Sequence, residues 1–94
     1  MENIIDFKPY MECDYKVYVD VNEFRLKDGS LIPISFIWED GNSYEIDRVK
    51  DVRQAASLKA GGVGMRYTVR VQNRETYMFY EDDGETCRWF MEKR

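Results

Sequence analysis

The sequence predicts an all-β fold: a small six-stranded antiparallel barrel or roll, about the size of an SH3 domain. Three observations favour it, namely short runs of alternating apolar and polar residues, Asp-Gly turns between those runs, and 14 aromatic residues in a chain of 94. Aromatic side chains bury large apolar areas, so a single core of this size can hold without metal or disulfides. We expect one β domain over residues 15–94, preceded by an N-terminal arm over residues 1–14.

The first strand is expected over residues 15–26. Its apolar side chains occupy odd positions as far as Val21 and then an even position at Phe24. Successive side chains point to opposite faces of a strand, so this slip predicts a bulge or bend near Asn22-Glu23. An Asp28-Gly29 turn should follow, because glycine accepts the positive φ that a tight hairpin needs.

An Asp40-Gly41 turn should join the second strand, residues 31–39, to the third. We expect the third strand from Ser43 to about Arg53, with a bulge near Asp47-Arg48. A helix over 46–60 is the alternative, since apolar residues there also recur at helical spacing before a glycine pair. The strand is favoured because hairpin turns join neighbouring strands. Residues 55–64 should then form a loop, with at most one short helical turn near 54–60.

The C-terminal part should be a three-stranded meander. Its predicted strands are Arg66–Val71, Thr76–Glu81 and Thr86–Met91, with turns at 72–75 and at Asp83-Gly84. The middle strand carries apolar side chains on both faces, and two interpretations of this remain open. Either both faces are covered within the domain, or one face is an interaction surface formed by Tyr77, Phe79 and Tyr80.

Several short motifs between Leu31 and Phe90 resemble a family of short uncharacterised bacterial proteins. The matching motifs are Pro33-Ile34-Ser35, Ile37-Trp38, Tyr44-Glu45-Ile46-Asp47-Arg48-Val49, Ala55-Ala56-Ser57-Leu58-Lys59-Ala60-Gly61-Gly62 and Arg66-Tyr67-Thr68. The layout from Ile46-Asp47-Arg48-Val49 to Trp89-Phe90 is also similar to small domains of unknown function found beside translesion polymerase genes. These resemblances imply a β-rich cytoplasmic domain and imply no activity, cofactor or catalytic residue.

The chain contains no histidine, which removes the commonest general base and the commonest transition-metal ligand. Its two cysteines, Cys13 and Cys87, form no C-x-x-C pair, so no zinc site of the usual kind is expected. We interpret them as free, buried thiols of a cytoplasmic protein, because the first residues do not form a secretory signal and no apolar run is long enough to span a membrane. No metal, cofactor or catalytic residue is predicted, and the protein is not expected to be an enzyme.

Charge is distributed unevenly along the chain. The net charge is −4, yet residues 48–74 hold seven basic side chains and one acidic one around a Gly61-Gly62-Val63-Gly64 stretch. Glycine-rich backbone and arginine forks bind oxyanions, which suggests an anion site. The candidate residues are Arg48, Arg53, Lys59, Gly62, Arg66 and Arg70. The alternative is a solvated strand face paired with acidic neighbours.

Convergence of these arginines depends on the strand register. Arg66 and Arg70 share a face, but Arg48 and Arg53 have opposite parity, so on a regular strand only one of them could join the pair. A bulge in that strand would change this.

The leading hypothesis for function is a non-enzymatic protein-interaction or self-associating module, with an unknown protein partner or a homodimer. The alternative is a domain that binds nucleic acid or another anion; no membrane partner is expected.

Overall fold

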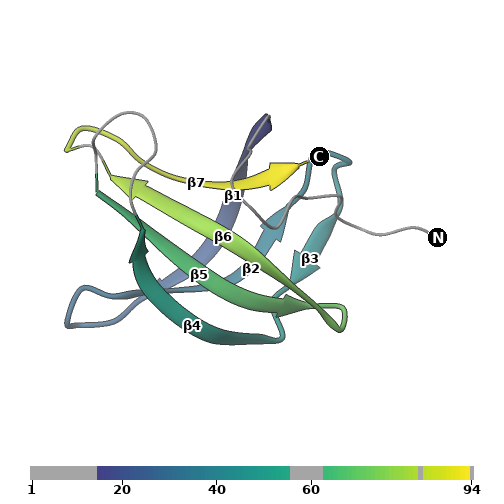
Figure 1. The fold of residues 1–94 in the computed structure, drawn as a ribbon, viewed down its shortest axis with the longest axis horizontal. Helices are drawn as coiled ribbons and strands as arrows, with labels where there is room; N and C mark the ends of the chain where they lie inside the picture. Colours follow the sequence, from purple (N-terminus) through teal and green to yellow (C-terminus); the bar gives the residue numbers. More distant parts are fainter. Residues whose placement is uncertain (1–14, 56–62, 83, 94) are drawn as a thin grey trace.

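The computed structural model describes residues 15–55, 63–82 and 84–93, which form seven antiparallel strands in a strongly curled half-barrel (Figure 1). The strands are β1 (Tyr15–Arg25), β2 (Leu31–Ile37), β3 (Ser43–Glu45), β4 (Arg48–Ala55), β5 (Val63–Val71), β6 (Arg74–Asp82) and β7 (Cys87–Lys93). Their order across the sheet is β3-β2-β1-β7-β6-β5-β4. The predicted all-β antiparallel fold is confirmed. No helix that could cross a membrane occurs among these residues.

The predicted third strand is two strands, which is why the sheet has seven rather than six. The Ile46 N–H donates to the Ile34 carbonyl of β2 (2.9 Å), whereas the next N–H, of Asp47, donates to the Arg70 carbonyl of β5 (2.8 Å). The chain thus changes partner within one residue, and β3 lies on β2 while β4 lies on β5. The helical alternative is wrong over residues 46–55. The turn expected near 54–60 falls mostly on residues 56–62, outside the described part.

The Asp-Gly turns occur where the sequence predicts them. Gly29 (φ 96°) lies between β1 and β2, and Gly41 (φ 85°) lies between β2 and β3, both in the left-handed region that favours glycine. Gly84 lies in the connection from β6 to β7, as predicted for the third turn; its neighbour Asp83 is outside the described residues. The β5–β6 turn is tighter than expected, so β6 begins at Arg74.

The bulge predicted in β1 occurs in the β1–β2 ladder, but the extra residue is on β2. Asn22 pairs with Ser35 and Glu23 pairs with Pro33, so Ile34 is the unpaired residue. Because β1 itself keeps its phase, Glu23 follows Val21 on the inner side. Phe24 points outward with 58% of its surface exposed. The irregularity predicted near Asn22-Glu23 is therefore confirmed, and Phe24 lies on the outer face of the sheet.

Strand β1 belongs to both halves of the curled sheet. Residues 15–19 pair with β7, and residues 20–25 pair with β2. The core fills the concave side between the halves; it comprises Leu31, Phe36, Trp38, Tyr67, Val69, Val71, Met78, Trp89 and Met91. The Tyr67 hydroxyl donates to the Leu31 carbonyl (2.9 Å), which ties β5 to β2 across the core, although these strands are not neighbours in the sheet. Cys87 is a free thiol, as predicted, but it is exposed rather than buried.

Candidate anion-binding surface

Four arginines of the predicted anion site lie on the outer face of β4 and β5. Arg48 is the cross-strand partner of Arg70, and Arg53 is the partner of Arg66. Directly opposed residues in an antiparallel pair point to the same face. Lys50 is the extra residue of a bulge between Val49 and Asp51, and it corrects the parity difference that would otherwise separate Arg48 from Arg53. We call Arg48, Arg53, Arg66 and Arg70 the arginine face.

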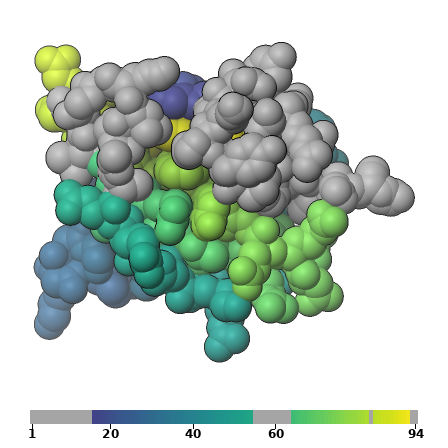
Figure 2. All heavy atoms as spheres, viewed as in Figure 1, coloured from purple at the N-terminus to yellow at the C-terminus, as the bar shows by residue number. Residues whose placement is uncertain are grey.

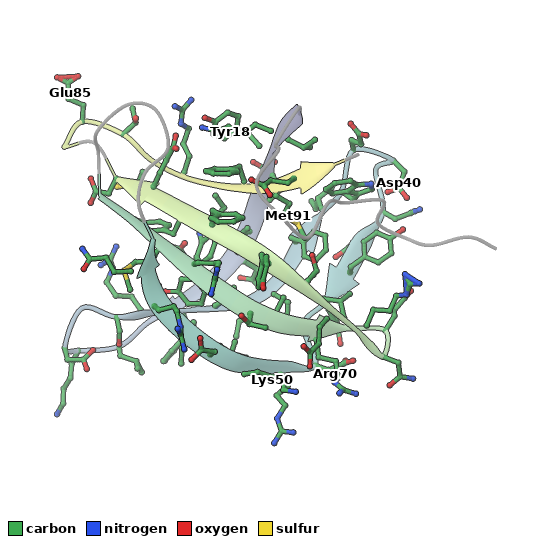
Figure 3. All side chains as sticks on the ribbon, viewed as in Figure 1. Tyr18, Asp40, Lys50, Arg70, Glu85 and Met91 are labelled. Atoms are coloured by element: carbon green, nitrogen blue, oxygen red, sulfur yellow. The ribbon has the colours of Figure 1, made fainter. Side chains whose placement is uncertain are left out.

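The two opposed pairs lie four residues apart along β5, which corresponds to about 13 Å of strand. The atoms of β4 (teal) and of β5 and β6 (green) lie side by side on one face of the molecule in Figure 2. Lys50 and Arg70, both labelled in Figure 3, lie near each other at the lower edge of that view. The arginine face is therefore a strip along two paired strands.

Like charges placed directly opposite one another destabilise a sheet. Two carboxylates offset part of this repulsion: Asp51 accepts a hydrogen bond from Arg53 Nε (2.8 Å), and Glu75 accepts one from Lys50 Nζ (2.6 Å). The Lys50 ammonium, with a smaller contribution from Arg70, holds the pKa of Glu75 below its ordinary value. Asp51 forms an ion pair with Arg53 and Glu75 forms one with Lys50, so these two carboxylates leave the strip with an excess of positive charge.

Two arginine side chains are held close to the sheet. The Nε atoms of Arg66 and Arg70 are buried and have no hydrogen-bond partner among the described residues. The Arg66 guanidinium lies over the Tyr77 ring, 4.5 Å from its centroid, which fixes the orientation of its fork. Arg48 and Arg53 are exposed. The surface thus combines two arginines whose Nε atoms are buried, one of them also held over an aromatic ring, with two exposed arginines.

The three residues of the predicted interaction surface do not share a face. Tyr77 and Phe79 point outward, where Phe79 stacks on Phe90 with 4.9 Å between ring centroids. Tyr80 points inward and packs on Trp89, with 5.0 Å between the ring centroids. Burial raises the pKa of Tyr80 to about 12, with a further contribution from a hydrogen bond with Cys87.

Strand β6 also offers no free edge at this point. Over Phe79–Asp82 it pairs with β5 on one side and with β7 on the other. The aromatic rings on the outer face of the sheet contact one another and nearby cations. For example, Lys16 Nζ of β1 lies 4.4 Å from the ring centroid of Phe90 on the paired strand β7. A partner surface at Tyr77–Tyr80 stays a prediction, and the residues available to it on the outer face are Tyr77 and Phe79.

Sequence reasoning missed Lys16, Tyr18 and Arg88, which extend the same outer face beyond β6. Their positions follow from the β1–β7 pairing, which joins distant parts of the chain and leaves no local pattern. Tyr18 donates to Glu81 (3.0 Å), and Arg88 lies 4.3 Å from the Tyr18 ring centroid. Lys59 and Gly62, also predicted for the anion site, lie outside the described residues.

A hollow of about 540 Å³ opens where β1 leaves β7, and it is lined by residues 18–23 and 87–89. Within it the Trp89 indole N–H donates to Glu23 Oε1 (2.7 Å), which satisfies both groups. In the part of the chain that the structure describes, no three histidine, cysteine or carboxylate side chains gather as metal ligands would. The arginine face is therefore the arrangement with the most evident binding chemistry.

Comparisons with known proteins give no guide to function, because no family model, curated protein or solved structure matches this chain.

Proposed function

We propose that this protein is a non-catalytic binding module whose arginine face binds the phosphates of single-stranded nucleic acid. The observation that carries the proposal is the register of β4 and β5, which opposes Arg48 to Arg70 and Arg53 to Arg66. Opposed like charges reduce the stability of the unliganded sheet, and an anion placed between them would remove that cost. Four guanidinium forks can each bind a phosphate bidentately, which lysines could not do.

The curvature of the sheet favours a single strand over a duplex. The arginine face lies on the outer side of a strongly curled half-barrel. A duplex is stiff over a length far greater than this domain, with a persistence length of about 50 nm, so it would meet a convex surface at few points. A flexible single strand can follow the strip and contact both arginine pairs. The neighbouring Tyr77 ring, already beneath Arg66, offers little free area for base stacking, so we expect weak sequence preference.

The test is fluorescence anisotropy with a labelled single-stranded oligonucleotide, titrated at several salt concentrations. With about four phosphate contacts, the affinity should fall roughly 50-fold between about 50 and 200 mM salt. The double variant Arg66→Ala with Arg70→Ala should bind more weakly and lose only about 7-fold over the same range, because two contacts remain. An equally tight duplex of the same sequence would contradict the preference for single strands.

A matched control separates the site from net charge. Arg25→Ala with Lys27→Ala removes the same two positive charges from outside the arginine face, at the β1–β2 hairpin, and it should leave the salt slope unchanged. Thermal unfolding of each variant checks that it is folded. Absence of binding by the unmodified protein at low salt, or an equal effect of the two double variants, would overturn the proposed function.

A further inference from the structure

Strand β2 has the sequence pattern of a strand covered on both faces. Seven of the eight residues from Leu31 to Trp38 are apolar, and such continuous runs are typical of strands buried on both sides. Only one side is covered here: Leu31, Phe36 and Trp38 belong to the core. The other side presents a stripe of three exposed isoleucines, Ile32, Ile34 and Ile37.

Phe24 extends this stripe onto β1. It is the cross-strand partner of Ile32, and its exposed fraction of 58% is the largest among the exposed large apolar residues of the described chain. The β1–β2 hairpin that carries it reaches beyond the rest of the sheet at the lower left of Figures 1 and 2. We call Phe24, Ile32, Ile34 and Ile37 the outer apolar patch.

The opposite end of the same face is hollowed. A depression of about 270 Å³ lies beside Ile37 and is lined by Asp20, Asn22, Ser35 and Ser43 among others. On β1 the hollow is lined by Asn22 and Asp20, which lie two and four steps from Phe24, or about 7 and 14 Å along the strand. A protruding aromatic ring and a hollow therefore lie at the two ends of one strand pair.

We propose that the occupant of this face is a second copy of the same chain, related by a two-fold axis. A two-fold contact pairs a surface with itself in the reverse direction, so Phe24 of each copy would lie at the hollow of the other. Charge follows the same order: Lys27 lies beyond Phe24 at the hairpin end, and Asp20 lines the hollow at the far end. The two-fold contact brings each Lys27 to the other copy's Asp20, whereas a parallel arrangement would oppose like charges.

The size of the patch sets the expected strength. Its exposed apolar area is on the order of 300 Å², against about 800 Å² per partner in a standard interface, so a dimer would have this patch as its centre and a polar rim around it. We expect a dissociation constant on the order of 100 µM, because the apolar centre is small. This inference is independent of the arginine face, which lies on β4 and β5.

Sedimentation velocity over about 10 µM to 1 mM protein tests the proposal, since the mass should rise from 11.3 kDa toward twice that value. Phe24→Ala should raise the dissociation constant at least about tenfold. Val52→Ala is the matched control, because Val52 is also an exposed apolar residue (43%) but lies on β4; it should leave the constant within about twofold. A monomer at 1 mM, or equal effects of the two variants, would overturn the proposal.

A charge exchange distinguishes a second copy from any other occupant. Lys27→Glu alone and Asp20→Lys alone should each weaken the dimer, since each opposes like charges across the two-fold contact. The double variant Lys27→Glu with Asp20→Lys should restore it to within about threefold of the original, because the exchanged pair is again complementary. Both residues are exposed, so folding is not at risk. Failure of the double variant to regain dimerisation would also overturn the two-fold arrangement.

Discussion

We expect the hydrogen bond of the Tyr67 hydroxyl to contribute strongly to the free energy that holds the two halves of the half-barrel together. Tyr67 is 5% exposed, and its hydroxyl donates over 2.9 Å to the carbonyl of Leu31, itself 6% exposed. Tyr67→Phe keeps the ring and removes only this bond, leaving a buried acceptor without that donor. Such a loss costs about 1–2 kcal/mol. In a domain of this size each kcal/mol lowers the melting temperature by about 4–8 °C, so we expect a fall of roughly 4–16 °C.

Calorimetry or thermal circular dichroism measures this change, with Tyr44→Phe as the control. The Tyr44 hydroxyl also donates to one acceptor, Asp40 Oδ2 (2.8 Å), but in an exposed position where water replaces the lost bond. Its removal should change the free energy of unfolding by less than about 0.5 kcal/mol. If Tyr67→Phe were as mild as Tyr44→Phe, the hydroxyl bond would not be what joins β5 to β2.

Three further predictions concern single groups. Glu23→Ala leaves the Trp89 indole N–H without its acceptor and should cost about 1 kcal/mol in urea unfolding, whereas Glu45→Ala, an exposed change on β3, should stay within about 0.5 kcal/mol. Gly41→Ala forces an L side chain to φ 85° and should cost about 1 kcal/mol; no change in melting temperature would contradict the strained turn. The folded protein raises the pKa of Tyr80 to about 12, whereas in the unfolded chain this tyrosine loses its proton near pH 10. The free energy of unfolding should therefore fall between pH 10 and pH 12. Tyr80→Phe should make that fall shallower.

Local sequence patterns predicted much of the fold, because turns and alternation depend on few residues. Asp28-Gly29 and Asp40-Gly41 predict hairpin turns from two residues each, because glycine readily adopts the positive φ that is observed at both turns. The irregularity near Asn22-Glu23 was also predicted, but the strand that holds the extra residue was not. A register shift looks the same from one strand whichever strand holds the extra residue, and only the pairing shows that Ile34 is that residue.

The arginine face shows what sequence could and could not predict of the candidate site. The residue types and the segment were evident from the charge distribution. Whether Arg48 and Arg53 could share a face depended on a bulge, and the expected position, near Asp47-Arg48, differs from the observed one at Lys50. The outward aromatic and cationic residues on β7 and β1 were not predictable, because their proximity requires pairing between the two ends of the domain.

That pairing has a consequence for how the domain is made. Tyr15 lies opposite Lys93, so the earliest described strand finds one of its two neighbours only in the latest. During synthesis the β1–β2 hairpin can form soon after it emerges, but the β7 side of β1 stays open until β3 to β6 and then β7 itself have been made. Contacts so distant in sequence slow folding. A permuted chain, with residues 15 and 93 joined by a short linker and new ends opened at Asp28-Gly29, would make the β1–β7 contact local and leave β1–β2 as the contact that closes last.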